Sequence, residues 1–188
     1  MTVIVLSKDE AAEALKKFQF DFLISINESE LSRVEGFDSF KGPKISLSFY
    51  DIEQELPGLN GPGIFEIESL LSFIKKQDIK EDSSVLIHCK AGISRSSAAA
   101  IILCNHLYND PDKAVDKVIA DIKVSIAHHM RLHDYIRPNR KMIYLSELLD
   151  EKKGLLDKVA STFEYSAKFD KKEVENLVDR AYPEVYFE

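Results

Sequence analysis

The stretch from Ser84 to Leu107 constrains the fold more than any other part of the chain. It begins with the apolar, β-branched run Val85 to Ile87, which predicts a buried strand, and ends with the Ala-rich run Ser96 to Leu107, which predicts a buried helix. A short loop that starts at Cys89 joins the two. Strand, loop and helix in this order are typical of open α/β sheets, where ligands bind at the carboxyl ends of the strands.

The loop itself has the features of an anion-binding cradle. Its backbone N–H groups can point inward, and the first N–H groups of the following helix add positive potential. Arg95 contributes a planar guanidinium that can hold two phosphate oxygens at once. We therefore expect a phosphate group to bind to this set of residues: Lys90, Ala91, Gly92, Ile93, Ser94 and Arg95.

Cys89 stands at the start of this cradle, where the potential that attracts a phosphate also favours the thiolate over the thiol. The thiolate is the nucleophilic form of cysteine. Ser96, directly after Arg95, can donate a hydroxyl hydrogen bond to the Cys89 sulfur and stabilise it as a leaving group. The second cysteine, Cys104, falls on the predicted buried helix, and we expect it to be a core residue.

The pattern His88-Cys89-x5-Arg95-Ser96, with Gly92 inside the loop, resembles the cysteine-based protein tyrosine phosphatase superfamily, specifically its compact dual-specificity branch. Rhodaneses also place a cysteine before an anion-binding loop, but they lack the His-Cys context. The resemblance implies two-step, metal-free hydrolysis of a phosphomonoester through a cysteinyl phosphate, without a cofactor. It leaves two roles for His88, either holding the loop and favouring the thiolate or making a hydrogen bond within the sheet.

The resemblance also implies a general acid, an aspartate at the end of a strand upstream of the cysteine, which protonates the departing oxygen. The alternating segment Lys44 to Tyr50 predicts a strand that delivers Asp51 to its end. We therefore expect Asp51 to be the acid. Glu53 and Glu55, on the same Gly- and Pro-rich loop, remain alternatives.

The remaining patterns predict a single α/β domain with a central, mostly parallel, twisted sheet of about four to five strands flanked by helices. Strands are expected at 3–7, 20–26, 44–50 and 84–87, helices at 8–18, 64–76, 96–107 and 112–126, and a long amphipathic segment from 140 to 159. Asn139, which follows Pro138 as in dual-specificity phosphatases, either supports the loop or caps the last helix. We divide the chain into a catalytic domain, 1–149, and a C-terminal helical extension, 150–188, of open role.

Composition limits the partners. The 188 residues suffice for one domain with a substantial core, and the net charge of −7 argues against nucleic acid and against a generally anionic membrane surface. No stretch has the roughly 20 apolar residues of a transmembrane helix, and we expect no secretory signal. A catalytic thiolate needs a reducing compartment, so we expect a cytoplasmic protein. His128, His129 and His133 lack the cysteine or carboxylate pattern that would complete a metal site, so no metal is expected. The oligomeric state stays open.

Three substrate interpretations follow. Ser94, where classical tyrosine-specific enzymes usually have glycine, and the short chain favour a shallow pocket for phosphorylated proteins or small phosphomonoesters. Lys90-Ala91-Gly92 also occurs in lipid phosphatases of the superfamily, which keeps an anionic lipid or inositol phosphate headgroup as an alternative. The third interpretation is a binding protein rather than an enzyme, a non-catalytic pseudophosphatase that binds phosphopeptides.

Seven basic residues between Lys113 and Lys141 are either a solvated helix surface or a basic rim that attracts phosphorylated substrates.

Overall fold

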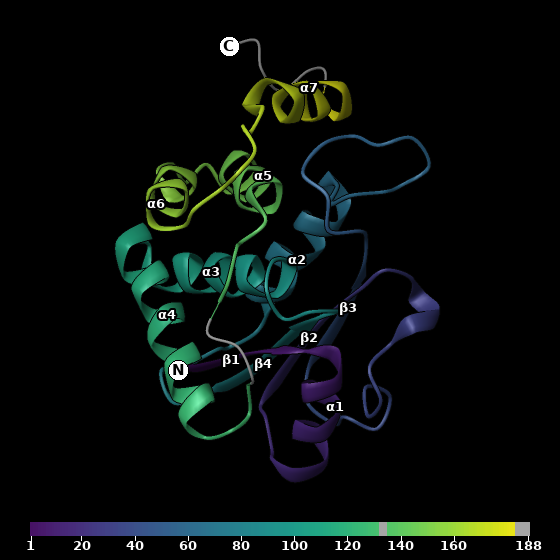
Figure 1. Ribbon diagram of the computed structural model, residues 1–188, viewed down its shortest axis with the longest axis vertical. Coiled ribbons are helices and arrows are strands. Elements are labelled where there is room, and N and C mark those ends of the chain that lie inside the picture. Colours follow the sequence, from purple (N-terminus) through teal and green to yellow (C-terminus); the bar gives the residue numbers. More distant parts are fainter. Residues whose placement is uncertain (132–134, 183–188) are drawn as a thin grey trace.

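The computed structural model describes residues 1–131 and 135–182 and confirms the expected α/β class (Figure 1). Its elements follow one another in this order: β1 (Thr2–Ser7), α1 (Lys8–Lys17), β2 (Phe22–Asn27), the 3-10 turn η1 (Glu30–Ser32), β3 (Lys44–Ser48), α2 (Ile64–Lys76), β4 (Ser84–Cys89), α3 (Arg95–Tyr108), α4 (Pro111–Ala127), α5 (Arg140–Asp150), α6 (Leu155–Thr162) and α7 (Lys171–Ala181).

The four strands form one parallel sheet in the order β1-β4-β2-β3. Strand β4, which leads to Cys89, lies between β1 and β2, so both of its edges are hydrogen-bonded. Its residues Val85, Leu86 and Ile87 have no exposed surface, as a parallel strand covered on both faces requires. Because all strands run in the same direction, their carboxyl ends meet at one edge, where the segments that follow them come together.

Helices cover the two faces of the sheet unequally. Helix α1 lies on one face, and α2, α3 and α4 lie on the other (Figure 1). Successive side chains of a strand point to opposite faces. In β1, Ile4 and Leu6 pack toward Ala11 of α1, whereas Val3 and Val5 belong to the larger cluster on the other face.

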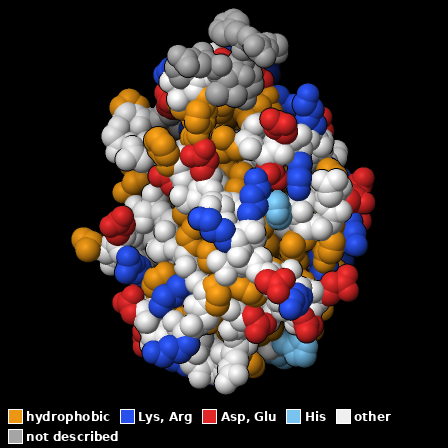
Figure 2. All heavy atoms as spheres, turned by 180° about the vertical axis from the view of Figure 1, so that it is seen from behind, with side chains coloured by type: hydrophobic (Ala, Val, Ile, Leu, Met, Phe, Trp, Pro, Cys, Tyr) orange, Lys and Arg blue, Asp and Glu red, His pale blue; other side chains and the backbone are white. Residues whose placement is uncertain are grey.

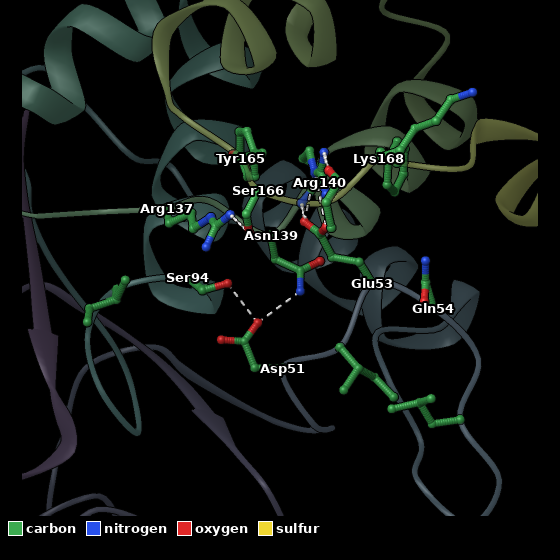
Figure 3. A pocket seen from close by; sticks show the side chains of 15 residues that line it. Asp51, Glu53, Gln54, Ser94, Arg137, Asn139, Arg140, Tyr165, Ser166 and Lys168 are labelled. Carbon is green, nitrogen blue, oxygen red and sulfur yellow. Dashed lines mark hydrogen bonds and ion pairs between the residues drawn. The ribbon is translucent and has the colours of Figure 1, made fainter.

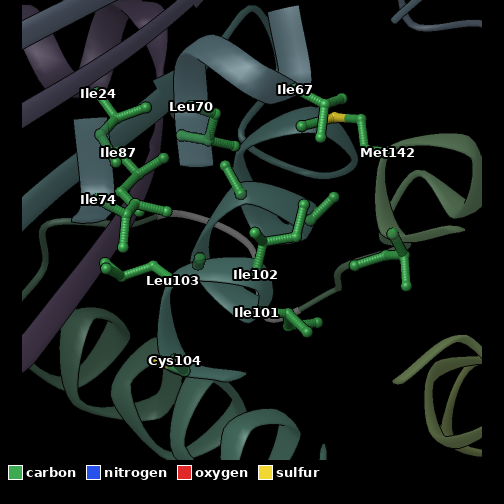
Figure 4. Packing of buried hydrophobic residues seen from close by; sticks show 14 of the residues in the cluster. Ile24, Ile67, Leu70, Ile74, Ile87, Ile101, Ile102, Leu103, Cys104 and Met142 are labelled. Atoms are coloured by element: carbon green, nitrogen blue, oxygen red, sulfur yellow. The ribbon is translucent and has the colours of Figure 1, made fainter. Parts of the chain in front are cut away.

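The larger cluster fixes helix α3 against the sheet. Ile24 and Ile87 of the sheet lie near Ile74 of α2 and Ile102 of α3 (Figure 4). Cys104, also on α3, is fully buried as expected of a core residue, and burial raises the pKa of its thiol to about 12. The helix that follows the Cys89 loop is therefore anchored along its length by apolar contacts.

The long amphipathic segment expected from 140 to 159 is divided into two helices. Glu151 and Gly154 both adopt positive φ, 53° and 95°, and the chain turns there, so that α5 and α6 are separate helices. The apolar spacing continues across the turn because Leu155 and Val159 pack back into the same hydrophobic cluster. Helix α7 adds Val174 to this cluster.

On the surface seen in Figure 2, acidic and basic side chains are interspersed. Among residues 1–131 and 135–182, no helix is long and apolar enough to cross a bilayer.

Candidate active site

The segment 89–95, here called the cradle loop, is held from outside through its backbone carbonyls. Four of these oxygens accept hydrogen bonds from groups outside the loop: Lys90 from the Lys8 N–H (3.2 Å), Gly92 from Arg131 Nη1 (2.7 Å), Ile93 from the Arg137 N–H (3.0 Å) and Ser94 from the Asn139 N–H (3.3 Å). In a trans peptide the C=O and N–H groups point in opposite directions. Outward carbonyls therefore leave the N–H groups of the same peptide units on the inner side, which is how backbone nests bind anions.

Gly92 is the one position of the cradle loop where only glycine fits. Its φ is +71°, and a Cβ atom there would lie 2.5 Å from the Ser7 nitrogen and 2.6 Å from the Leu6 carbonyl carbon. The buried Arg131 side chain closes this contact, because its Nη1 donates to the carbonyls of both Gly92 and Val5 (2.9 Å). The cradle loop is thus packed directly on the carboxyl end of β1.

Cys89 is the last residue of β4 and is 1% exposed. Its Sγ lies 3.1 Å from the Oγ of Ser96, which is buried in the first turn of α3. The structure therefore brings the expected nucleophile and its expected hydroxyl partner together. The thiol belongs to the residue at which β4 ends and the cradle loop begins.

Arg95 begins α3 and turns its guanidinium toward the segments that follow β2 and β3. Its Nη1 donates to the Phe49 carbonyl at 2.7 Å, and its Nη2 lies 3.8 Å from Glu28 Oε1. Its Nε is buried and has no hydrogen-bond partner among the described residues. Lys90, by contrast, points outward, with Nζ 3.2 Å from Glu28 Oε2. Sequence reasoning did not identify Glu28, because a single glutamate after a strand carries no pattern.

His88 lies at the centre of the sheet with no exposed surface. Its Nε2 is 2.8 Å from the Oγ of Ser25, its neighbour across the β2–β4 ladder. Burial lowers the pKa of His88 to about 4, so the ring is neutral at neutral pH. Of the two roles left open for His88, a neutral ring bonded to Ser25 corresponds to the hydrogen bond within the sheet.

Asp51 lies in the loop between β3 and α2, residues 49–63, here called the acid loop. Strand β3 ends at Ser48, so Asp51 follows the strand by two residues more than the sequence pattern indicated. Its Oδ1 accepts hydrogen bonds from Ser94 Oγ at 2.7 Å and from Asn139 Nδ2 at 2.9 Å (Figure 3). One hydroxyl of the cradle loop and one amide from the start of α5 therefore position this carboxylate.

Asn139 fulfils both roles that the sequence left open. Its Oδ1 accepts the N–H of Met142 at 3.0 Å and so caps α5, while its Nδ2 binds Asp51. The backbone N–H of Asn139 also donates to the carbonyl of Ser94. One residue therefore connects the cap of α5, the cradle loop and the acid loop.

Of the two alternative acids, Glu53 has its carboxylate engaged elsewhere. Both carboxylate oxygens of Glu53 accept hydrogen bonds from the Arg140 guanidinium, and the Arg140 N–H donates to Glu53 Oε1 at 2.7 Å. Arg140 also donates to the carbonyl of Ala167 at 3.0 Å. The backbone N–H of Glu55 donates a hydrogen bond to the carboxylate of Glu173 in α7 at 2.7 Å. These contacts tie the acid loop to the C-terminal part of the chain.

The basic run between Lys113 and Lys141 fits neither of the two interpretations along its whole length. Arg131 and Arg140 are buried and hold the cradle loop and the acid loop, respectively.

Of the three histidines considered for a metal, His133 lies outside the described residues. Within the described part of the chain, no three His, Cys, Asp or Glu side chains are grouped as a metal would require.

Comparison with known proteins returns phosphatase structures. No family model matches the chain, and no curated protein matches it. Among solved structures, it is similar to Tk-PTP in its active form (14% identity, TM-score 0.48, 81% of this chain and 94% of the other), to PTPMT1 in complex with PI(5)P (15%, 0.49, 85% and 93%) and to human DUSP28 (14%, 0.48, 80% and 95%). The chain is thus similar in fold to these phosphatase structures. At identities this low, the likeness concerns the fold alone.

Proposed function

We propose that the chain hydrolyses phosphomonoesters of proteins through a phosphorylated Cys89, as a tyrosine or dual-specificity phosphatase. The observation that carries the proposal is the cradle loop, whose outward carbonyls leave an inner ring of N–H groups above the Cys89 sulfur. The buried Nε of Arg95, which has no partner among the described residues, supplies a further donor for a phosphate oxygen.

In the first step, the Cys89 thiolate attacks phosphorus and forms an S–P bond while the P–O bond to the leaving group breaks. Asp51 gives its proton to the departing oxygen. Hydrogen bonds from Ser94 and Asn139 to one carboxylate oxygen orient the other toward that oxygen. The loop N–H groups and Arg95 stabilise the charge on the three equatorial oxygens.

In the second step, water attacks the cysteinyl phosphate and the S–P bond breaks. Asp51, now ionised, accepts the proton of the attacking water, which releases inorganic phosphate. The departing sulfur is stabilised by the Ser96 hydroxyl, 3.1 Å away. This regenerates the Cys89 thiolate and the protonated carboxyl group of Asp51.

A protein substrate is favoured over an anionic lipid headgroup by the electrostatics around Lys90. The case for a polyanionic headgroup was the positive charge of this lysine beside the nucleophile. In the structure, Glu28 lies 3.2 Å from its ammonium group and offsets that charge. A chain with a net charge of −7 also gains nothing from an anionic bilayer.

The test is hydrolysis of p-nitrophenyl phosphate by the wild type, Cys89→Ser and Cys104→Ala, with acid-quench trapping of phosphorylated protein. Cys89→Ser is expected to lose roughly 10⁴-fold in kcat and to trap no phosphoprotein, because serine is not ionised in this site. Cys104→Ala, which removes the other thiol, is the matched control and should retain turnover. Turnover by Cys89→Ser would refute the assignment of the nucleophile. A folded, reduced wild type that binds phosphopeptides without hydrolysing them would instead establish the pseudophosphatase alternative.

A further inference from the structure

A cavity of about 420 Å³ lies beside the cradle loop, on the side of Asp51. Its inner wall contains Asp51 and Ser94, and its outer wall is the irregular segment 165–169 between α6 and α7 (Figure 3). Because Asp51 must reach the oxygen of the leaving group, the leaving group has to extend along this cavity. The C-terminal segment, whose role the sequence left open, therefore helps to form the substrate's surroundings.

Arg137 is fixed in the wall of this cavity. Its backbone N–H binds the Ile93 carbonyl of the cradle loop, and its Nη2 donates to the Oγ of Ser166 at 3.0 Å. The guanidinium carbon lies 5.3 Å from the centroid of the Tyr165 ring, which is itself held by a hydrogen bond to the Pro138 carbonyl at 2.7 Å. The guanidinium is thus preorganised one side-chain length from the cradle loop. Among the described residues, one of its five N–H groups donates a hydrogen bond, which leaves the others available to a ligand.

The charges in the cavity do not balance. Arg140 is paired with Glu53, and Asp51 is bound by Ser94 and Asn139. Among the described residues, neither Arg137 nor Lys168, which also lines the cavity, has a carboxylate oxygen within 4.0 Å. The lining therefore holds three cations against two carboxylates, an excess of one positive charge in a chain with a net charge of −7. Arg137, beside the leaving-group position, is a local site for an anion.

We propose that Arg137 binds an acidic side chain next to the phosphorylated residue of a peptide substrate. The proposal rests on the proposed phosphatase function and names the class of peptide that this site prefers. A planar, preorganised guanidinium suits a carboxylate, which accepts two parallel N–H bonds. The distance fits a neighbouring residue, because the Arg137 backbone is hydrogen-bonded to the cradle loop itself.

The experiment measures binding rather than turnover, using full-length Cys89→Ser protein and calorimetry at about 0.15 M salt. The probes are two phosphotyrosine peptides that differ only in carrying glutamate or glutamine on either side of the phosphotyrosine. The acidic peptide is expected to bind roughly tenfold more tightly, as one charge-assisted bidentate contact allows. Adding Arg137→Gln should reduce this ratio to about twofold or less, whereas Arg137→Lys should keep part of it.

Arg180→Gln, which removes one exposed positive charge on α7 outside the cavity, is the matched control and should leave the ratio unchanged. Equal binding of both peptides to Cys89→Ser would overturn the subsite. Wild-type turnover of p-nitrophenyl phosphate would then still stand, so that the proposed function would survive. Absence of both phosphopeptide binding and turnover would refute the two proposals together. Faster hydrolysis of phosphatidylinositol phosphate vesicles than of either peptide, reduced by Arg137→Gln, would replace the peptide with a membrane substrate.

Discussion

The two walls of the candidate active site are built in opposite ways. The cradle loop is one continuous segment between a buried strand and a buried helix. Its backbone carbonyls accept the hydrogen bonds that hold it in place. The opposite wall combines Asp51 and Glu53 with Asn139 and Arg140, and with the segment 165–169, joined by side chains. The proposed nucleophile, Cys89, is therefore positioned by local backbone geometry, and the proposed acid, Asp51, by contacts between distant parts of the chain. Substitutions should affect the two walls differently.

The largest effect is expected from Gly92→Ala in the cradle loop. The new methyl group would require both a strained φ and a contact of 2.5 Å with the Ser7 backbone, so the loop cannot keep its shape. We expect kcat to fall roughly 10³-fold and the free energy of unfolding to fall by about 3 kcal/mol. Steady-state kinetics and urea unfolding measure the two quantities. Gly58→Ala, at an exposed turn with open space around its Cβ position, tests positive φ without the contact and should retain turnover.

Asp51→Asn tests the opposite wall. Asparagine keeps the hydrogen-bonding shape but cannot give a proton to the departing oxygen, so kcat for phenyl phosphate should fall roughly 10²-fold. The loss for p-nitrophenyl phosphate should be much smaller, because its leaving group departs with little protonation. Comparing kcat for the two substrates measures this difference. Equal losses for both would assign the acid to Glu53 or Glu55 and leave Asp51 a structural residue.

The lowered pKa of His88 predicts that the free energy of unfolding depends on pH. Its pKa is about 4 in the folded protein and about 6.5 in an unfolded chain, so the unfolded state binds more protons between these values. Stability is therefore lost as the pH falls from 6.5 toward 4, by about 2 kcal/mol between pH 7.5 and pH 5. Urea unfolding at both pH values, with wild type and His88→Gln, measures it. The variant should lose this part of the pH dependence, and identical losses in the two proteins would contradict the assignment.

The smallest effect is expected from Arg140→Lys. Lysine keeps the charge but cannot bind both Glu53 oxygens in a planar fork or donate at the same time to the Ala167 carbonyl. The acid loop should shift slightly, and kcat for phenyl phosphate should fall roughly tenfold, with a smaller loss for p-nitrophenyl phosphate. Arg180→Lys on the exposed surface of α7 is the control. A tenfold loss with both substrates would show that Arg140 serves the cradle loop rather than the acid loop.

The same contrast explains which parts were predictable from sequence. Strand, loop and helix from Ser84 to Tyr108 are contiguous, and apolar spacing together with one short motif predicts their arrangement. The contact of Arg131 with Gly92 spans 39 positions, and that of Arg140 with Glu53 spans 87. Arginines in a helical, charged region have the same appearance in a sequence whether they are buried or solvated. Pairings over such distances depend on the folded topology, which local patterns do not contain.

The break between α5 and α6 was missed for a related reason. Apolar spacing continues through Glu151 and Gly154, because both helices pack on one core. The turn depends on two residues with positive φ, and only Gly154 gives a sequence signal for it. Without that turn, the segment 165–169 would not reach the cavity beside Asp51.

The burial of Cys104 has a practical consequence for chemical labelling. The chain contains two cysteines, and at neutral pH the thiol of Cys104, with a pKa of about 12, is almost entirely protonated and enclosed by the core. Cys89 is 1% exposed but begins the cradle loop, so an alkylating reagent small enough to enter that loop is expected to modify Cys89 rather than Cys104. The adduct stoichiometry read from intact mass then gives the fraction of the protein in which Cys89 is reduced and accessible, without a substrate and without removing any native residue.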